Sequence, residues 1–193
     1  MKASHAAALA FITLALLITA YAASAMKAIG RLQVSYSING ADIQALEDEE
    51  YYYSVLNDLR EAREEVLVAM YSMIYDPDDP YDWANDLIQE LAKAEERGVQ
   101  VRVIIEYRTY WGCKDENLEA YDYLKEHGVD VKLDYDSETD HLKLVVIDGR
   151  IAYVGSHNWS EAGLYYNREV TVRIVDEGIA SELRSYFNEL WGS

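Results

Sequence analysis

The chain has 193 residues, of which half are hydrophobic and only two are proline, and its formal net charge is −18. This length fits one domain plus a short extra segment and excludes a second large domain, while the composition excludes long disorder. An acidic protein repels polyanions, so any phosphate site must be locally basic. The single cysteine, Cys113, excludes an internal disulfide. It is interpreted as inert or buried, with an exposed thiol or an interchain link as alternatives.

An uncharged segment rich in Ala, Leu and Ile occupies residues 6–26 and follows Lys2. It ends in Ala-Ser-Ala at residues 23–25, which is typical of a signal peptidase site. The segment is also long enough to span a bilayer as an uncleaved anchor, and the basic residues on its two sides are balanced. We therefore expect residues 1–25 to be a signal peptide or a membrane anchor and residues 26–193 to form the main domain. The protein would be exported, to the periplasm or outside the cell, or anchored to the membrane.

Strand and helix patterns alternate after this segment, which is typical of an α/β domain. Continuous apolar runs indicate buried strands, Asp79 and Pro80 mark a helix start, and Gly98 and Gly128 mark helix ends. The expected strands are residues 32–37, 66–74, 99–107 and 129–133. The expected helices are residues 47–65, 79–98, 115–127 and 176–191.

The most informative stretch is residues 140–160, DHLKLVVIDGRIAYVGSHNWS. Alternate residues of a strand share a face, so His141 and Lys143 point the same way. Their neighbours are apolar on both faces, which predicts a buried strand. A histidine and a lysine in such a strand lose hydration free energy unless an anion compensates, and this indicates a functional site.

A hairpin is predicted at Asp148-Gly149, a favoured two-residue loop. Directly opposed residues share a face, so this loop would place His141 opposite Ser156 and bring Ser156, and just past it Asn158, up beside His141 and Lys143. Lys143 and Asn158 suit the nonbridging oxygens of an anionic tetrahedral centre, with the Ser156 hydroxyl as a further substrate-binding group. A histidine can attack phosphorus or carry a proton near neutral pH.

A lone histidine and lysine on a strand are more often an ordinary polar pair at a sheet edge. The joint spacing distinguishes this motif from such an ordinary pair. Each of its six fixed positions matches by chance about one time in twenty, so a chain of this length contains the whole pattern by chance less than roughly once in a hundred thousand. HLKLVVID followed by GSHN resembles the HxKxxxxD and GSxN signature of the phospholipase D superfamily. The resemblance covers residues 32–191 and is greatest to small single-motif members, the secreted bacterial nucleases and the mitochondrial nuclease or cardiolipin hydrolase.

The resemblance implies a phospholipase D-like fold, a mixed sheet flanked by helices, in the catalytic domain of residues 26–193. It also implies two cooperating motifs, and because this chain has one, it implies a homodimer with a shared active site. His141 would then attack phosphorus to form a phosphohistidine, and His141 of the partner subunit would protonate the leaving oxygen and later activate water. Lys143 and Asn158 of both subunits would bind phosphoryl oxygens, with no metal and no cofactor.

Two acidic residues have positions that match the family pattern. The resemblance assigns Asp148 to orienting the hairpin. It assigns Glu169 to a hydrogen bond that sets the tautomer of the catalytic histidine. The alternative for Glu169 is an ordinary solvent-facing strand residue.

Several other features have weaker interpretations. The acidic run Asp134, Asp136, Glu138 and Asp140 is expected to be a solvated loop rather than a metal site. The aromatic residues of 107–111 and Trp159 could stack bases, line an acyl groove or seal the dimer.

Two activities fit the same chemistry. The favoured one is a nuclease, with Arg108, Arg150 and Arg168 supplying local attraction for DNA or RNA. The alternative is a phospholipase D or cardiolipin hydrolase acting on phospholipid headgroups. A third possibility, from another class, is a phosphate-binding module without catalysis, against which the intact His141, Lys143 and Asn158 argue.

Overall fold

The computed structural model describes residues 35–38, 40–107, 115–135 and 138–192. The leader, Arg108, Cys113 and Asp136 lie outside the described residues. Residues Ser35–Ser193 make up one compact unit. None of the helices in the described part is both long enough and apolar enough to cross a membrane.

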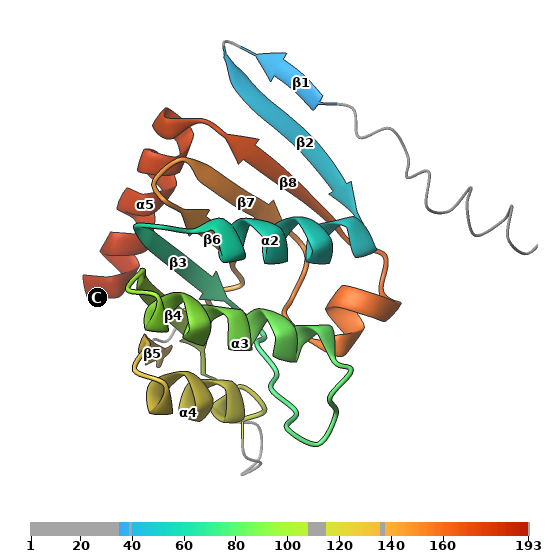
Figure 1. Ribbon diagram of the computed structural model, residues 1–193, viewed down its shortest axis with the longest axis vertical. Helices are drawn as coiled ribbons and strands as arrows, with labels where there is room; N and C mark the ends of the chain where they lie inside the picture. The colour runs from blue at the N-terminus through green and yellow to red at the C-terminus, as the bar shows by residue number, and fades with distance from the viewer. Residues whose placement is uncertain (1–34, 39, 108–114, 136–137, 193) are drawn as a thin grey trace, which may run out of the picture. The chain divides into compact units, whose positions relative to one another are not determined.

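A mixed sheet of eight strands runs through the described part of the chain, with the order β1-β2-β8-β7-β6-β3-β4-β5 (Figure 1). The strands are β1 (Ser35–Ile38), β2 (Ala41–Glu47), β3 (Glu65–Met70), β4 (Gln100–Glu106), β5 (Asp130–Asp134), β6 (Lys143–Ile147), β7 (Ile151–Gly155) and β8 (Val170–Val175). β4 is parallel to β3 and β5, whereas the other neighbours are antiparallel. The expected mixed α/β sheet is confirmed.

Helices cover both faces of the sheet (Figure 1). They are α2 (Glu49–Glu61), α3 (Trp83–Glu96), α4 (Leu118–Glu126), α5 (Glu177–Gly192) and a π-helical turn, η1 (Ala162–Tyr166). Because strand side chains alternate, Val66 and Val68 of β3 pack in the core under α2, α3 and α4, while Leu67 and Ala69 pack with Phe187 of α5. β3 and β6 are buried on both faces, as their apolar runs predict.

Several elements differ from the sequence prediction, and three of the differences have a clear origin. β2 was not predicted, although the Asn39-Gly40 dipeptide before it is a hairpin signal. α3 begins after Asp82 rather than at Asp79, because the Asp82 carboxylate accepts a hydrogen bond from the Ala84 amide and caps the helix. β3 ends at Met70 rather than at residue 74, since the following backbone bonds to groups outside the sheet ladder.

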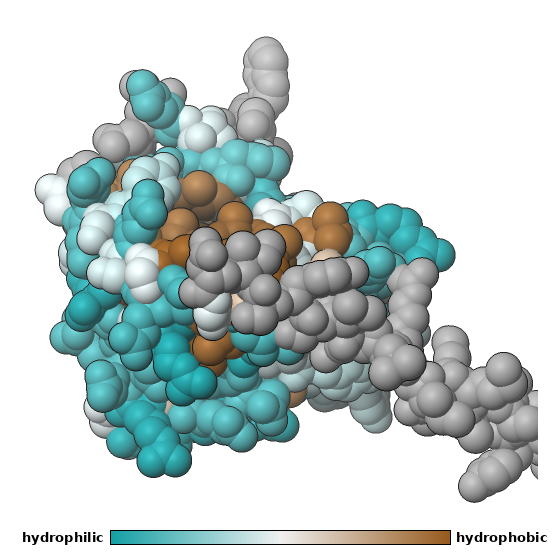
Figure 2. All heavy atoms as spheres, turned by 90° about the horizontal axis from the view of Figure 1, so that it is seen from above, coloured by the Kyte–Doolittle hydropathy of each residue, from teal (hydrophilic) through white to brown (hydrophobic). Residues whose placement is uncertain are grey.

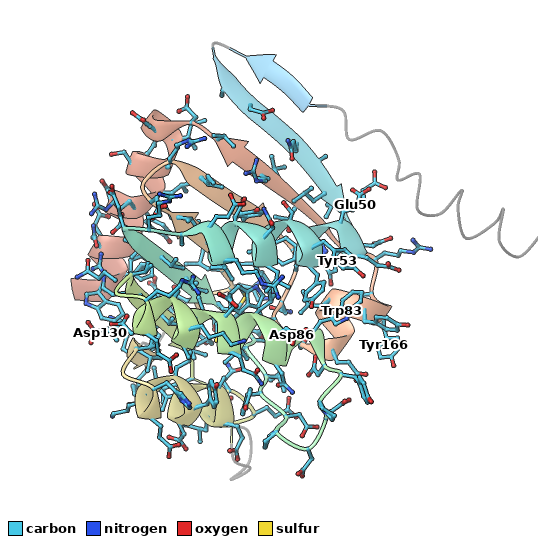
Figure 3. All side chains as sticks on the ribbon, viewed as in Figure 1. Glu50, Tyr53, Trp83, Asp86, Asp130 and Tyr166 are labelled. Carbon is cyan, nitrogen blue, oxygen red and sulfur yellow. The ribbon has the colours of Figure 1, made fainter. Side chains whose placement is uncertain are left out.

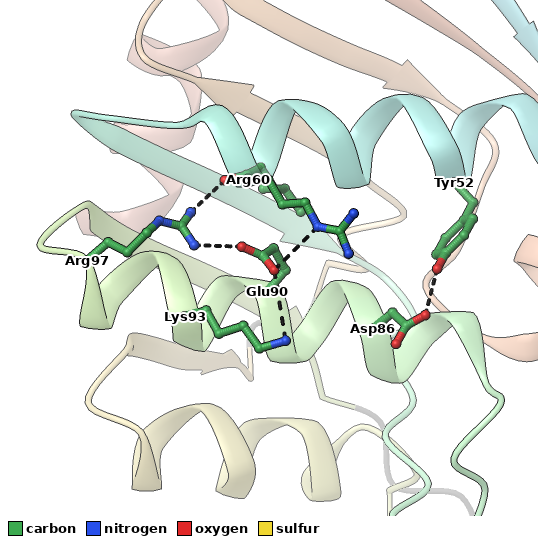
Figure 4. Close-up of polar contacts among 7 residues, drawn as sticks. Tyr52, Arg60, Asp86, Glu90, Lys93 and Arg97 are labelled. Carbon is green, nitrogen blue, oxygen red and sulfur yellow. Dashed lines mark hydrogen bonds and ion pairs between the residues drawn. The ribbon is translucent and has the colours of Figure 1, made fainter.

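A buried acidic residue joins α2 to α3 (Figure 4). Glu90 of α3 is 4% exposed, and its carboxylate is surrounded by three cations. These are Arg97 at 2.6 Å, Arg60 at 3.8 Å and Lys93 at 4.0 Å. Arg97 also donates to the Leu59 carbonyl of α2, so the buried charge is paired and also fixes the two helices relative to one another.

The β6–β7 hairpin has a different register from the one predicted. Ile147 pairs with Ile151, so the loop has three residues, Asp148 to Arg150, rather than two. This shift of one residue sets Lys143 level with Gly155, and His141 precedes the strand instead of lying within it. The predicted pairing of His141 with Ser156 is therefore wrong.

Asp148 anchors this hairpin to the junction between α2 and β3. Its carboxylate accepts hydrogen bonds from the backbone amides of Arg63, Glu64 and Glu65, at 2.8 to 3.2 Å. Leu142 and the five residues of β6, which span about 16 Å of strand, separate it from His141. Asp148 therefore anchors the hairpin, and it is too far from His141 for direct proton transfer.

Replacing Asp148 tests this anchor. Asp148→Ala is expected to lower the free energy of unfolding by about 2 kcal/mol or more, because three amides lose their acceptor and alanine tolerates the backbone φ of 52° poorly. Asp148→Asn is the matched control, since asparagine keeps one acceptor oxygen and adopts positive φ more readily. Urea unfolding measures both variants, and equal losses would contradict the anchor.

Candidate active site

The motif residues lie at one edge of the sheet, where β3, β4 and β7 end and β6 and β8 begin. Met70 at the end of β3 pairs with Lys143 at the start of β6. Gly155 at the end of β7 pairs with Thr171 near the start of β8. Strand ends at one edge bring side chains from distant parts of the sequence together, which makes this edge the candidate active site.

His141 and Lys143 contact each other directly. The Nζ of Lys143 lies 3.2 Å from Nε2 and 3.3 Å from Nδ1 of His141, whose side chain is exposed. A neutral imidazole has one acceptor nitrogen, so the ammonium can donate to only one of the two at a time. Lys143 is only 9% exposed, which places a weakly hydrated cation beside an accessible histidine.

Tyr71, which was not foreseen from the sequence, completes this cluster. Its ring centroid is 4.3 Å from that of His141 at an interplanar angle of 63°, and the Nζ of Lys143 lies 4.6 Å from its centroid. A cation near an aromatic face is stabilised by the ring quadrupole. Tyr71 therefore restricts where both side chains can lie.

The segment after β3 holds the two halves of the motif together. The Tyr71 amide donates to the carbonyl of Leu142, between His141 and Lys143. Trp159, the residue after Asn158, makes two backbone hydrogen bonds with the same segment. Its amide donates to the Ser72 carbonyl, and its carbonyl accepts from the Ile74 amide. The same short stretch of backbone thus fixes both motif halves, and this brings Asn158 to the edge that carries His141.

Asn117 fixes that segment in turn. This residue is 1% exposed, its side-chain oxygen accepts from the Met73 amide, and its Nδ2 donates to the carbonyls of Tyr71 and Glu106. Three hydrogen bonds from one buried amide satisfy it almost completely. No sequence motif marks Asn117, because its partners are backbone groups far away in the chain.

Asn158 keeps unused hydrogen-bonding capacity at the site. Its buried Oδ1 has no hydrogen-bond partner among the described residues. An unpaired buried amide oxygen is costly, and turning the amide group exchanges a donor for the acceptor at the same place. Gly163 of η1 packs so closely on the Asn158 backbone that an added Cβ would lie 2.6 Å from its carbonyl oxygen.

The Gly155-Ser156 pair fastens β7 to β8. A Cβ on Gly155 would lie 2.2 Å from the Thr171 hydroxyl, so only glycine fits there. The Ser156 hydroxyl accepts from the Val170 amide at 3.1 Å and donates to the Val170 carbonyl at 3.3 Å. Its single proton is used in this second bond, so in this arrangement Ser156 cannot also donate to a substrate oxygen.

His157, between Ser156 and Asn158, is fully buried and locks the loop. Its Nε2 lies 3.0 Å from the Asp48 carbonyl and its Nδ1 lies 2.7 Å from the Thr171 hydroxyl. The carbonyl can only accept, so Nε2 carries the proton, and in the neutral ring Nδ1 accepts from the Thr171 hydroxyl. Burial lowers the pKa of His157, against opposing contributions from the Asp48 carbonyl and the nearby carboxylates of Glu169 and Asp48.

Glu169 lies near this lock. Its carboxylate accepts from the side-chain amide of Asn167 at 3.1 Å, and its backbone pairs with Asp48. The hydrogen bonds from Glu169 and Arg168 lower the pKa of Asp48. Glu169 precedes β8 and is half-buried, so it is not an ordinary solvent-facing strand residue. The expected hydrogen bond between Glu169 and His141 stays a prediction.

Three further residues that the sequence suggested for substrate binding lie in three different environments. Trp159 is fully buried and donates to the Tyr51 hydroxyl at 2.9 Å, so it is a core residue and can neither stack bases nor line a groove. Arg150 lies in the hairpin loop at the far end of β6, too distant to attract substrate. Arg168 is 92% exposed and pairs with Asp48.

In the acidic run, Asp134 lies at the end of β5, Glu138 is exposed as expected of a solvated loop, and Asp140 is half-buried. Glu106, 5% exposed at the end of β4, accepts a hydrogen bond from the Asp140 amide at 2.9 Å and so positions the residue before His141. Within the described part of the chain, no group of three or more His, Cys, Asp or Glu side chains could hold a metal ion.

Comparison with known proteins identifies the class. Residues 55–191 match the family described as "Cardiolipin synthase, PLD-like domain", and the chain therefore belongs to the phospholipase D superfamily.

Two mitochondrial cardiolipin hydrolases are among the relatives. The one from Xenopus tropicalis is 33% identical over 95 residues, 49% of this chain and 43% of that protein. The one from Chlamydomonas reinhardtii is 27% identical over 116 residues, 57% of this chain and 46% of that protein. The chain thus spans less than half the length of these relatives.

A solved structure confirms the fold. Nuc from Salmonella typhimurium, a phospholipase D family member, superposes with a TM-score of 0.67 at 22% identity, covering 79% of this chain and 95% of that one.

The buried His157 predicts a pH-dependent stability. Its pKa in the folded state lies below the ordinary value of 6.5, so between these two values the unfolded chain binds more protons. Its contribution to stability is therefore complete above pH 6.5 and is lost as the pH falls through the folded-state pKa. Urea unfolding at several pH values should show a smaller loss of stability on acidification in His157→Gln than in the unchanged protein. Equal pH slopes in the two proteins would contradict the neutral lock.

Proposed function

We propose that this protein is a phosphodiesterase that hydrolyses its substrate through a phosphohistidine on His141. The observation that carries the proposal is the contact between an exposed histidine and a buried lysine at the sheet edge, in a chain of the phospholipase D superfamily. The buried ammonium of Lys143 supplies the positive charge that phosphoryl oxygens require on an otherwise acidic protein.

The reaction has two steps. A ring nitrogen of His141 forms a bond to phosphorus while the bond from phosphorus to the leaving oxygen breaks, and a second histidine gives that oxygen its proton. The second histidine then takes a proton from water, whose oxygen bonds to phosphorus as the bond to His141 breaks. Lys143 and the Asn158 amide hold the phosphoryl oxygens in both steps, and the cycle needs no metal.

The second histidine is proposed to be His141 of the partner subunit. Two apolar side chains support a homodimer: Val154 on β7 and Val170 on β8 are 43% and 51% exposed, near the strand ends that form the site. Figure 2 shows an apolar area on a surface that is largely hydrophilic. A twofold interface that covers Val154 and Val170 would bring two copies of the site edge together.

For the substrate, a phospholipid headgroup is the first candidate. A formal charge of −18 repels a nucleic acid, and the relatives include cardiolipin hydrolases. DNA or RNA is the second candidate, favoured by the exposed Arg168 beside the site loop. The two candidates share the chemistry and differ only in what surrounds the phosphodiester.

The catalytic proposal predicts a specific pattern of activity. The protein should hydrolyse cardiolipin or phosphatidylcholine vesicles, or failing these fluorescent DNA or RNA, with full activity in EDTA. His141→Ala should lower kcat by about a thousandfold or more, because the nucleophile is lost. His127→Ala, a histidine at the end of α4 remote from this edge, is the matched control and should keep full activity. Loss of activity in EDTA or an active His141→Ala protein would refute the mechanism.

The dimer proposal has its own test. Val154→Asp combined with Val170→Asp should convert the protein to a monomer in analytical ultracentrifugation and abolish hydrolysis, because charges at a buried apolar contact oppose association. Tyr186→Asp, at an exposed position on α5, is the control and should leave both unchanged. A fully active monomer at micromolar concentration would contradict a shared site.

A further inference from the structure

A pocket of about 270 Å³ lies between the loop before α3 and the π-helical turn η1. Its lining consists of four aromatic and three acidic side chains, with no lysine, arginine or histidine among them. None of these residues belongs to the proposed catalytic set. The volume is slightly below the usual range for small-molecule sites, so only a compact ligand fits the pocket.

The aromatic wall is built from rings that hold one another at right angles. The ring centroids of Trp83 and Tyr165 are 5.1 Å apart at 82°, and those of Tyr165 and Tyr166 are 4.9 Å apart at 90°. Trp83 is also stacked on Tyr52 of α2 at 4.4 Å, which fixes the wall to the core. Figure 3 shows Trp83 and Tyr166 close together beside the start of α3, with Tyr53 nearby.

These rings remain open to solvent although they are large. Tyr165 is 57% exposed, Tyr166 is 66% exposed, and Tyr81, which lines the same pocket, is 88% exposed. Single exposed rings are common on protein surfaces and need no explanation. Several exposed rings gathered around one pocket are typical of a binding site.

The carboxylates of the pocket lack a compensating cation. Asp79, Asp82 and Glu161 make no ion pair with any described residue, and their bonds are to the Tyr81 amide, the Ala84 amide and the Tyr166 hydroxyl. The pKa of Asp82 is raised, first by burial and then by the negative charges of Glu161, Asp79 and Asp76, against the Ala84 hydrogen bond. The charge of Glu161 and its hydrogen bond also raise the pKa of Tyr166.

We propose that this pocket binds an organic cation of the methylated ammonium class, such as a choline or trimethyllysine group. Such a cation is weakly hydrated and is stabilised over aromatic faces, and the carboxylates of Asp82 and Glu161 add attraction. A metal ion would need several converging oxygen or nitrogen ligands, and the described residues contain no such group. The site does not depend on the reaction proposed for His141.

The test compares a cation with its neutral isostere. Calorimetric titration of the full chain in a maltoside detergent should show choline binding at least about tenfold more tightly than 3,3-dimethylbutan-1-ol, which has the same shape without the charge. Tyr165→Ala with Tyr166→Ala should weaken choline binding about tenfold or more, and Glu161→Gln, which keeps the volume of the side chain, should weaken it severalfold. Tyr186→Ala on α5 is the matched control and should bind as the unchanged protein does, and so should His141→Ala.

Three results would overturn the proposal. The first is equal affinity for choline and the neutral alcohol. The second is a choline affinity that stays unchanged in both Glu161→Gln and the double tyrosine variant. The third is that neither choline nor trimethyllysine binds at about 50 mM. Within a positive result, tighter binding of phosphocholine than of a trimethyllysine peptide indicates a lipid headgroup as the source of the cation. The reverse order indicates a methylated protein.

Discussion

The fold of the site depends on the backbone hydrogen bonds that the segment after β3 makes with two distant stretches of chain. Tyr71 bonds to Leu142, and Ser72 and Ile74 bond to Trp159. These bonds replace a sheet ladder that stops at Met70, so the segment satisfies its polar groups only if both stretches are in place. Because Asn117 holds the segment from its other side, the position of His141 and Asn158 is set by a buried amide that contacts neither of them.

A second constraint keeps the GSxN loop rigid without any charge. His157 is neutral, buried, stacked on Tyr51 at 4.4 Å and bonded at both ring nitrogens. Gly155 lets β7 approach β8 more closely than any side chain would allow. Ser156 and His157, which lie between the motif positions Gly155 and Asn158, therefore serve the fold.

The two proposed sites use opposite electrostatics on one acidic molecule. At the sheet edge, the ammonium of the buried Lys143 supplies positive charge for the proposed phosphoryl group. At the pocket between the α3 entrance and η1, unpaired carboxylates and exposed rings create negative potential for an organic cation. η1 lies next to both, since its Gly163 packs on Asn158 and its tyrosines line the pocket. The proposed cation pocket therefore lies on the same turn of chain that packs against the Asn158 backbone.

The sequence by itself determined the α/β class and most of the helices and buried strands, because hydrophobic periodicity is a local property of the chain. Motif spacing is also local, and it singled out His141, Lys143, Asn158 and Asp148 as candidate site residues. The tertiary structure decided the hairpin register, since a loop of three residues rather than two depends on the contacts of Asp148 with the α2–β3 junction. It also decided that Trp159 is core, that Ser156 fastens two strands, and that Tyr71, Glu106 and Asn117 support the site. These roles come from contacts between residues far apart in the sequence, and local pattern carries no signal for such contacts.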